Sequence, residues 1–257
     1  MDALELFNLS GRCALVTGGG RGLGRIIAFA LAQAGANVAV ASRNEKMCAD
    51  VARKIAETTG RVAVSSKLDV AEKSSVQEAV RSTKEKLGSI DILVNNSGIG
   101  WGAPLEEMPL EKWETTVSVN LTGTFLMCQS VVPLMKERRW GRIINVSSVA
   151  GIHGTPPFMP VSGYVASKGG IISLTRDLAV KLAEYNIVVN AIAPSFFPTD
   201  LNKVLFDKYG EQIRQRNPMK RAGEDDDLKG VVVFLASEAS RYVTGQVIPI
   251  DGGVTAA

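Results

Sequence analysis

The chain has 257 residues, of which 46% are hydrophobic and 21% charged, and its formal net charge is +3 at pH 7. This composition is ordinary for a globular domain and argues against a disordered chain or a nucleic-acid-binding protein. Because His153 is the only histidine, a histidine-based metal site is excluded, and we predict no bound metal.

Three further features predict a cytoplasmic protein with no membrane partner. The segment from Met1 to Ser10 lacks the basic and apolar regions of a signal peptide. No apolar run reaches the roughly 18–20 residues that a membrane span needs. The three cysteines are scattered without a CxxC pair, and Cys13 and Cys128 lie in apolar contexts that are typical of reduced core residues.

Apolar strands alternate with amphipathic helices along the whole chain. The predicted strands are short, β-branched and nearly continuous in apolar character, as expected of strands that are covered on both faces. They span residues 13–17, 37–41, 62–67, 90–95, 141–147, 187–193 and 246–250, and helical patterns between them include 26–33, 45–59, 76–87 and 110–135. No linker or repeat divides the chain. We therefore predict one domain over residues 1–257, an α/β Rossmann fold with a doubly wound parallel sheet of about seven strands and helices on both faces.

A glycine-rich turn follows the first predicted strand. It contains Gly18, Gly20, Gly22 and Gly24, and a helical pattern comes directly after it. A strand, a glycine turn and a helix together present backbone N–H groups and a helix N-terminus to a pyrophosphate. Glycines also serve tight turns without a ligand, but this arrangement favours a dinucleotide site.

The end of the second predicted strand indicates which dinucleotide is bound. Sites for NAD generally need an acidic residue here, which accepts from the ribose 2′-hydroxyl and repels a 2′-phosphate. This chain has Ser42 and Arg43 instead, a small donor and a guanidinium suited to phosphate. Arg21 in the glycine turn could add a second cation. We therefore predict NADP(H).

Tyr164 and Lys168 lie four residues apart in a predicted helix, so their side chains share one face. Free tyrosine titrates near pKa 10, and one lysine charge about 4 Å away supplies roughly the 4 kcal/mol that would bring its pKa to about 7. Ser148 ends the fifth strand, where its hydroxyl can donate to the same carbonyl oxygen that Tyr164 protonates. Ser147 is the alternative for this serine.

These residues, taken together, resemble the short-chain dehydrogenase/reductases of the single-domain kind. The resemblance covers nearly the whole chain and is carried by Thr17-Gly18-x-x-x-Gly22-x-Gly24, Asn95-Asn96-Ser97-Gly98, Asn120, Ser148, Tyr164-x-x-x-Lys168 and Pro194-Ser195. Two positions depart from the family pattern, since members usually have alanine at 97 and glycine at 195. Both departures concern loop geometry, because neither residue belongs to the proton chemistry.

The resemblance implies roles for individual residues. It makes Tyr164 the general acid or base, Lys168 its partner and a ligand of the nicotinamide ribose, and Ser148 the residue that orients the carbonyl. It gives Asn120 a water that relays protons to Lys168. The cofactor contacts that follow are Gly18, Gly20, Arg21, Gly22, Leu23, Gly24, Ser42, Arg43, Asp69, Val70, Asn95, Ser97, Gly98, Tyr164, Lys168, Pro194 and Thr199. Asp69 could also cap the helix that follows Val70, and the two roles can both hold.

The resemblance also bears on the reaction, the substrate and the assembly. It implies an oxidoreductase that moves a hydride between NADP(H) and a carbonyl or secondary alcohol, and a homotetramer. Two irregular segments, 151–163 and 196–223, are candidate substrate walls because both leave the carboxyl ends of strands. Their Phe158, Met159, Phe196 and Phe197, and the cation-free run 99–104, favour a 3-oxoacyl thioester or a bulky apolar ketone. The alternatives are a gluconate 5-dehydrogenase-like sugar-acid enzyme and, less favoured, a dinucleotide-sensing regulator without catalysis.

Overall fold

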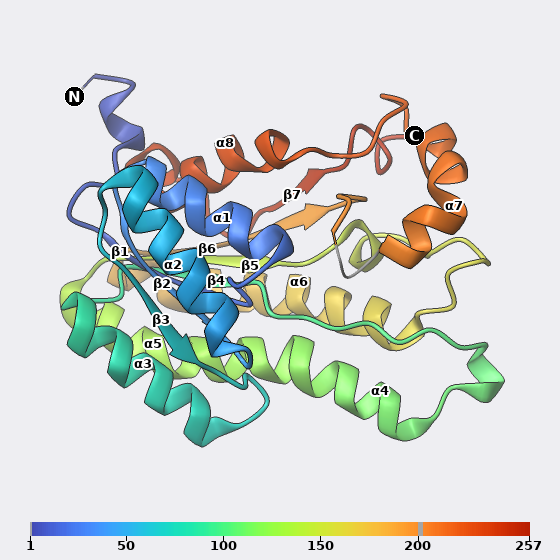
Figure 1. The fold of residues 1–257 in the computed structure, drawn as a ribbon, viewed down its shortest axis with the longest axis horizontal. Helices are drawn as coiled ribbons and strands as arrows, with labels where there is room; N and C mark the ends of the chain where they lie inside the picture. Colours follow the sequence, from blue (N-terminus) through green and yellow to red (C-terminus); the bar gives the residue numbers. More distant parts are fainter. Residues whose placement is uncertain (1, 200–202) are drawn as a thin grey trace.

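The structure, a computed structural model, describes residues 2–199 and 203–257. Seven parallel strands form one sheet in the order β3-β2-β1-β4-β5-β6-β7 (Figure 1). The strands are β1 Cys13–Thr17, β2 Asn37–Ser42, β3 Ala63–Lys67, β4 Ile92–Asn95, β5 Gly141–Val146, β6 Ile187–Pro194 and β7 Val247–Ile250. The predicted doubly wound α/β sheet is confirmed, and each strand lies within two residues of its predicted bounds.

Helices cover both faces of this sheet. One face carries α1 Gly22–Gln33, α2 Glu45–Thr59 and α8 Asp225–Ala236, and the other carries α3 Lys73–Leu87, α5 Gly123–Arg138 and α6 Ser162–Leu182. Two further helices, α4 Leu110–Val117 and α7 Lys203–Arg216, lie toward the end of the sheet at which the strands finish (Figure 1). The predicted helix at 201–209 begins outside the described residues. Short 3₁₀ turns are η1 Glu5–Phe7, η2 Leu105–Glu107, η4 Val149–Gly151, η5 Ala183–Tyr185 and η6 Glu238–Ser240.

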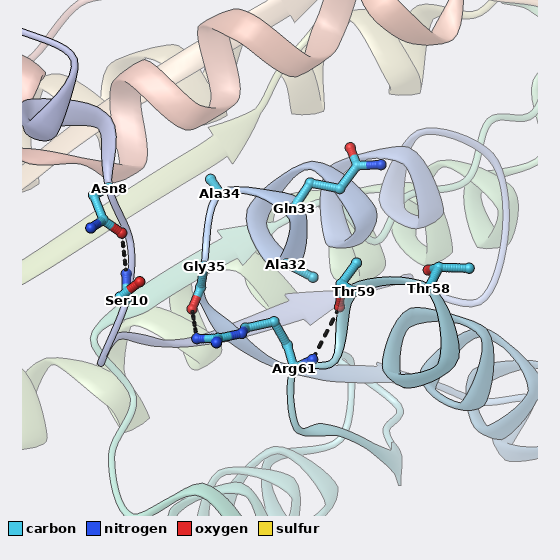
Figure 2. Close-up of a pocket in the computed structure, with 9 residues that line it drawn as sticks. All are labelled: Asn8, Ser10, Ala32, Gln33, Ala34, Gly35, Thr58, Thr59 and Arg61. Atoms are coloured by element: carbon cyan, nitrogen blue, oxygen red, sulfur yellow. Dashed lines mark hydrogen bonds between the residues drawn. The ribbon is translucent and has the colours of Figure 1, made fainter.

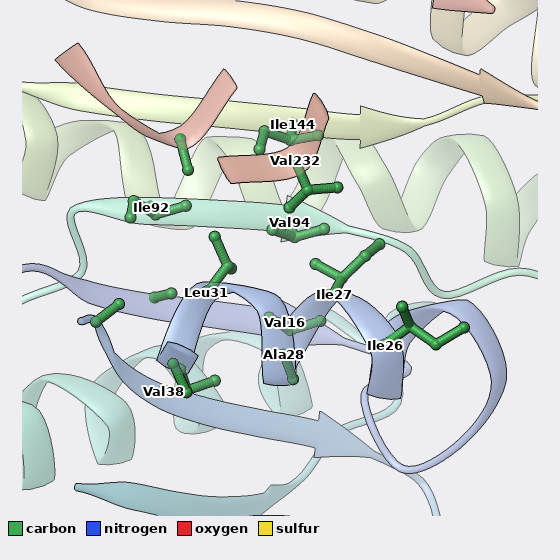
Figure 3. Packing of buried hydrophobic residues seen from close by; sticks show 14 of the residues in the cluster. Val16, Ile26, Ile27, Ala28, Leu31, Val38, Ile92, Val94, Ile144 and Val232 are labelled. Carbon is green, nitrogen blue, oxygen red and sulfur yellow. The ribbon is translucent and has the colours of Figure 1, made fainter. Parts of the chain in front are cut away.

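The packing of α1 shows how the sequence pattern produces these layers. Ile27 and Leu31, four residues apart on one face of the helix, are fully buried against Val16 of β1 and Val94 of β4 (Figure 3). Val232 of α8 joins the same cluster from the neighbouring helix. Truncating one such side chain to alanine typically costs 2–5 kcal/mol, so this layer fixes where the glycine turn before α1 is held.

The predicted helix at 110–135 is interrupted. A π-helical turn, Ser118–Thr122, separates α4 from α5, which continues to Arg138. Asn120 lies in this turn, is fully buried and uses its side-chain amide to bind Ile99 in the loop after β4. Hydrophobic periodicity does not reveal such a turn, because the register of one helical face shifts by a single residue.

The same run differs from the expectation that no stretch reaches the length of a membrane span, because Leu110–Arg138 is long and apolar enough for one by length and composition. It is the one stretch of that kind among residues 2–199 and 203–257. Met127, Val131 and Met135 of α5 are fully buried in the core beneath the sheet. The run therefore has the composition of a helix that packs along a parallel sheet.

Candidate active site

A cleft of about 410 Å³ lies at the carboxyl ends of β1, β2, β4, β5 and β6. It brings together most residues that the sequence predicts for the site: Gly18, Gly20, Arg21, Gly22, Leu23, Ser42, Arg43, Asp69, Val70, Ser97, Gly98, Ser148, Tyr164, Lys168, Pro194 and Thr199. Three predicted residues, Gly24, Asn95 and Asn120, lie behind the lining. The cleft also includes Ile99, which the prediction left out, Asn96, which it named only within the motif, and Ser147, which it named only as the alternative serine.

The glycine turn has a backbone that side chains would not fit. Gly18 and Gly22 have φ values of +65° and +51°, in the left-handed region that favours glycine. A Cβ on Gly24 would stand 2.3 Å from the carbonyl oxygen of Gly18, so this glycine allows α1 to approach the turn. Gly22 faces Thr199 across the cleft, with its Cβ position 3.4 Å from the Thr199 methyl. The first two glycines shape the cleft and the third packs the helix behind it.

Two arginines stand at the edge of the cleft, Arg43 directly after β2 and Arg21 in the glycine turn. Arg43 and Arg21 are exposed at the edge of the cleft, and neither forms an ion pair with a carboxylate of the described residues. The Ser42 hydroxyl donates to the carbonyl oxygen of Asn44 at 3.2 Å and lies 3.0 Å from the Cys48 Sγ. The side chain of Asn44 caps α2 by accepting from the N–H of Met47. This corner suits a dianion such as a 2′-phosphate.

Asp69 does not cap a helix directly after Val70, so that second predicted role is wrong. Its carboxylate accepts from the Ala71 N–H at 3.1 Å, and its own N–H donates to Ser75 Oγ at 2.9 Å. The helix α3 begins at Lys73, three residues later than a capping pattern with Asp69 as its first residue predicts. A tight turn thus holds Asp69 at the wall of the cleft, where the resemblance expects the adenine.

The sequence predicts that Asn95 lies beside the cofactor, but in the structure Asn95 binds within the core and Asn96 lies at the cleft. The Asn95 amide donates within the core to Asn145 Oδ1 at 2.9 Å, whose own amide donates to Thr175 of α6. Asn96 instead reaches the glycine turn, donating to the carbonyl oxygens of Thr17 and Gly18. The motif pointed to both residues, but only the fold shows that Asn96 is the one at the cleft.

Tyr164 and Lys168 both come from α6, as the four-residue spacing predicts. The Lys168 Nζ lies 5.5 Å from the centre of the Tyr164 ring and donates to the Val146 carbonyl oxygen at 2.7 Å. Lys168 is only 3% exposed, and this burial lowers the pKa of its ammonium from 10.5 to about 8. The lysine therefore titrates near the pH at which proton transfer is useful.

The pKa of Tyr164 differs from the expectation. Burial raises it above its ordinary value, and the hydrogen bond with the Ser148 side chain opposes this rise without cancelling it. The predicted pKa near 7 for Tyr164 rests on the attraction of Lys168 alone. Desolvation opposes it, because it disfavours both the phenolate of the half-buried Tyr164 and the ammonium of the buried Lys168.

Ser148 follows β5 with an extended backbone, φ −167° and ψ 156°. Its hydroxyl oxygen accepts from the Ala150 N–H at 3.2 Å, and its contact with the Pro194 carbonyl oxygen is a long 3.5 Å. Apart from its hydrogen bond with Tyr164, the hydroxyl is thus weakly held and can turn toward a ligand. The neighbouring Ser147 hydroxyl donates to the main-chain oxygen of Lys168 at 2.8 Å instead.

Asn120 is committed to neighbouring protein groups. Its amide accepts from the Ile99 N–H at 2.8 Å and donates to the Ile99 carbonyl oxygen and to Ser167 Oγ, both at 2.9 Å. A Cβ built on Gly98 would lie 3.4 Å from Asn120 Oδ1 and 3.6 Å from Lys168 Nζ, so the three positions are close. The side chain fixes the loop after β4, and the water relay stays a prediction.

The aromatic residues predicted at the mouth separate into two groups. Phe197 is 4% exposed and packs in the core against Gly223, although its edge also lines the cleft. Phe158 is half-buried and stacks on Tyr209 of α7 with ring centres 4.7 Å apart. Met159 and Phe196 are half-buried as well. The predicted apolar wall of the substrate site therefore loses most of the Phe197 side chain to the core.

The fold also brings cations to this side, which the local sequence could not reveal. The Lys112 ammonium lies 5.1 Å from the ring centre of Trp101, and the Arg216 guanidinium lies 5.5 Å from that of Phe158. Both come from segments outside the cation-free run 99–104. None of these four residues is in the lining of the cleft, and the predicted mouth is aromatic but not free of positive charge.

A second hollow lies at the opposite end of the sheet, between the ends of α1 and α2 (Figure 2). Several of its polar groups are already used within the protein: Arg61 donates to the Gly35 carbonyl oxygen, and Ser10 N–H donates to Asn8 Oδ1. The Thr59 hydroxyl donates back to its own helix. This hollow holds none of the residues that the sequence predicts for the site, all of which lie in or directly behind the cleft.

Comparisons with known proteins agree with this geometry. A family model described as enoyl-(acyl carrier protein) reductase matches residues 18–255. The 3-oxoacyl-[acyl-carrier-protein] reductase FabG of Staphylococcus epidermidis is 39% identical over 243 residues, which are 95% of this chain and 98% of that protein.

Two solved structures are similar over their whole length. A short-chain type dehydrogenase/reductase from Mycobacterium marinum superposes with a TM-score of 0.96 at 38% identity, covering 100% of both chains. A gluconate 5-dehydrogenase from Burkholderia cenocepacia J2315, in complex with NADP and tartrate, gives a TM-score of 0.94 at 40% identity with the same coverage. With a match this long, and with Ser148, Tyr164 and Lys168 around one cleft, the chain belongs to the short-chain dehydrogenase/reductase family of oxidoreductases.

Proposed function

We propose that this oxidoreductase uses NADP(H). The main support is the part of the cleft that is lined by Ser42, Arg43 and Arg21. Two exposed guanidinium groups line this part of the cleft without an ion pair among the described residues, and Ser42 stands where an NAD site generally has an acid, a combination that favours a 2′-phosphate. The glycine turn supports the same ligand, because its backbone leaves room where Cβ atoms would stand. The NADP bound to the gluconate 5-dehydrogenase from Burkholderia cenocepacia is in line with this assignment.

In the proposed reaction, the bound cofactor supplies or receives the hydride, and the protein moves the proton. Tyr164 donates its hydroxyl proton to the carbonyl oxygen in reduction and accepts it in oxidation. Ser148 turns its weakly held hydroxyl toward the same oxygen and orients the carbonyl. Lys168 stabilises the phenolate that forms on Tyr164, and Asn120 keeps the Gly98–Gly100 loop in place beneath them.

For the substrate we propose a 3-oxoacyl thioester or a bulky apolar ketone. Trp101, Phe158, Met159 and Phe196 are partly exposed around the irregular segments that leave the strands. Partly exposed aromatic and thioether side chains suit an acyl chain or a ring. The 39% identity to the Staphylococcus epidermidis reductase supports the thioester.

One observation keeps a sugar acid as the second candidate. Lys112 and Arg216 lie against the rings of Trp101 and Phe158, so a carboxylate entering this side would find cations. The structural similarity to the gluconate 5-dehydrogenase, with its bound tartrate, points the same way. The third alternative, a regulator that only senses dinucleotide, needs no turnover.

A side-by-side assay tests these proposals. A 3-oxoacyl thioester, an apolar cyclic ketone and 5-ketogluconate are compared at equal concentration with NADPH and with NADH, following the absorbance of the nicotinamide. We expect NADPH with the thioester or the cyclic ketone to give the highest kcat/KM. The sugar-acid assignment replaces ours if 5-ketogluconate is best, and the sensor remains if no carbonyl is reduced.

We also propose that residues 1–257 form a single domain and that the protein works in the cytoplasm as a homotetramer. All three cysteines, Cys13, Cys48 and Cys128, are free and buried, as suits a reducing compartment. The strand β7 ends the sheet and is only half-buried, which suits a surface that a second copy covers.

A further inference from the structure

We propose that Ser147 is a positioning residue, whose hydroxyl holds the main chain of Lys168 so that the lysine ammonium stays beside Tyr164. The inference rests on the proposed function, in which Lys168 assists proton transfer by Tyr164. It also gives separate roles to two adjacent serines that the sequence alone presents as competitors for one role. Ser148 faces the ligand, and Ser147 faces the helix.

The contacts of Ser147 are well defined. It is 2% exposed, and its main-chain N–H donates to the Ile192 carbonyl oxygen of β6 at 2.8 Å, which fixes its backbone to the sheet. Its hydroxyl donates to the Lys168 carbonyl oxygen at 2.8 Å. Since a hydroxyl has a single hydrogen to donate, this bond leaves Ser147 none for a substrate oxygen.

Lys168 is held at both of its ends by consecutive residues at the end of β5. The Ser147 hydroxyl binds its main-chain oxygen, and the Val146 carbonyl oxygen accepts from its Nζ at 2.7 Å. A third element closes on the same carbonyl group: a Cβ on Gly151 would lie 2.6 Å from the Lys168 carbonyl carbon and 2.8 Å from its oxygen. The close contact with the η4 turn limits how near α6 can approach. The hydrogen bond from Ser147 fixes the position of Lys168 along β5.

The position of this lysine matters because its effect on Tyr164 is electrostatic. At an effective dielectric constant near 20, lengthening a charge separation from about 4 to about 5 Å weakens the attraction by roughly a fifth, or about half a pKa unit. Of the titratable side chains that line the cleft, Arg21, Arg43 and Asp69 belong to the adenine end. A displaced Lys168 therefore has no neighbouring cation to replace it.

The test compares Ser147→Ala and Ser147→Cys with Ser173→Ala, a matched control on the exposed side of the same helix. In alcohol oxidation with NADP⁺, the acidic limb of the kcat/KM profile should move to higher pH by roughly half a unit in Ser147→Ala. It should move less in Ser147→Cys, which keeps a weak donor of similar size. The Ser173→Ala profile should match that of the wild type.

A second readout does not depend on turnover. The side-chain resonance of Lys168 is followed by NMR as pH changes, in lysine-labelled protein without cofactor, and is assigned by its loss in Lys168→Met. A released lysine is less desolvated, so its titration should move upward from about 8 in Ser147→Ala.

The outcomes separate this inference from the proposed function. If the wild type reduces no carbonyl with NADPH, the proposed function fails, while the NMR titration still judges Ser147. If the wild type is active and Ser147→Ala leaves both the rate profile and the Lys168 titration unchanged, Ser147 is not a positioning residue. The same conclusion follows if Ser147→Ala loses thermal stability while its rate profile and its Lys168 titration match those of the wild type.

Discussion

Lys168 is 3% exposed, and desolvation lowers the pKa of its ammonium from 10.5 to about 8. The unfolded chain binds a proton at this lysine up to about pH 10.5, whereas the folded chain releases it near pH 8. The lysine therefore costs stability in full below pH 8, and this cost disappears as the pH rises to 10.5. By linkage the cost at pH 7 is about 3 kcal/mol.

This cost predicts that Lys168→Met is inactive yet more stable than the wild type. Methionine removes the buried charge, but it also removes the donor to the Val146 carbonyl oxygen. The loss of this hydrogen bond lowers the gain in stability by about 1 kcal/mol. We expect a net rise of about 2 kcal/mol in the free energy of unfolding, measured with urea at pH 7. Lys181→Met, at an exposed ion pair with Asp177 on the same helix, should change stability little. A destabilised Lys168→Met would contradict the prediction.

Tyr164→Phe isolates the phenolic proton. The variant keeps the ring and loses the hydroxyl, so kcat should fall by about 10²–10⁴-fold while the affinity for NADPH stays within about twofold. Tyr242→Phe serves as the control, because Tyr242 is fully exposed. The measurements are steady-state rates and a fluorescence titration of NADPH. A Tyr164→Phe variant that retained most of its kcat would show that Tyr164 is not the general acid.

Sequence reasoning found the residues whose spacing reports chemistry and missed those whose role depends on the fold. Tyr164 and Lys168 were predicted because a four-residue spacing on a helix is local. The contact of Ser147 with Lys168 joins residues 21 apart in the chain, and no local pattern encodes it. The raised pKa of Tyr164 likewise depends on burial, which a motif does not report.

At the scale of elements, α7 is tied to the loop before α6 by one aromatic pair. Phe158 and Tyr209 stack with ring centres 4.7 Å apart, and Arg216 lies over Phe158. The segment that precedes α7, from Pro194 to Thr199, lines the cleft. The pair therefore couples the two irregular segments that the sequence proposes as substrate walls.

Tyr209→Ala should accordingly weaken substrate binding more than cofactor binding. An aromatic pair contributes about 0.5–1.5 kcal/mol, so we expect the substrate KM to rise by roughly 2–10-fold with little change in the KM for NADPH. Phe158→Ala should have a similar effect, and the double variant should be no worse than either single one, since both remove the same contact. Additive effects in this double-mutant cycle would show that the rings act separately.

The strands were the elements that the sequence predicted most closely. Strands buried on both faces are apolar throughout, and every one was found within two residues. The π-helical turn at Ser118–Thr122 was missed because the apolar pattern continues through it. Phe197 was assigned to the mouth from its place in an irregular segment, yet it packs against Gly223 in the core, and only long-range packing distinguishes the two sites.

At the scale of the whole molecule, apolar side chains are exposed beside the last strand of the sheet. Tyr242 is fully exposed and Val180 is 81% exposed. The two surfaces adjoin, because a Cβ on Gly245 would lie 3.4 Å from the Cβ of Ala179. The edge strand β7 follows directly and is only half-buried. An unpaired sheet edge next to exposed apolar residues is a surface that proteins usually cover.

We therefore expect a homotetramer in which a second copy of the chain covers the surface around Val180, Tyr242 and β7. Closed tetramers with dihedral symmetry need more than one self-complementary face, and the exposed Leu110 and Phe125 on α4 and α5 offer another. Light scattering at micromolar concentration should give four times the chain mass. Val180→Glu, which buries a charge in the first face, should shift the protein to a dimer, whereas Val62→Glu, 53% exposed just before β3 at the opposite edge of the sheet, should leave it tetrameric. A wild type that is monomeric under these conditions would refute the assembly, and a tetrameric Val180→Glu would assign the contact to a different face.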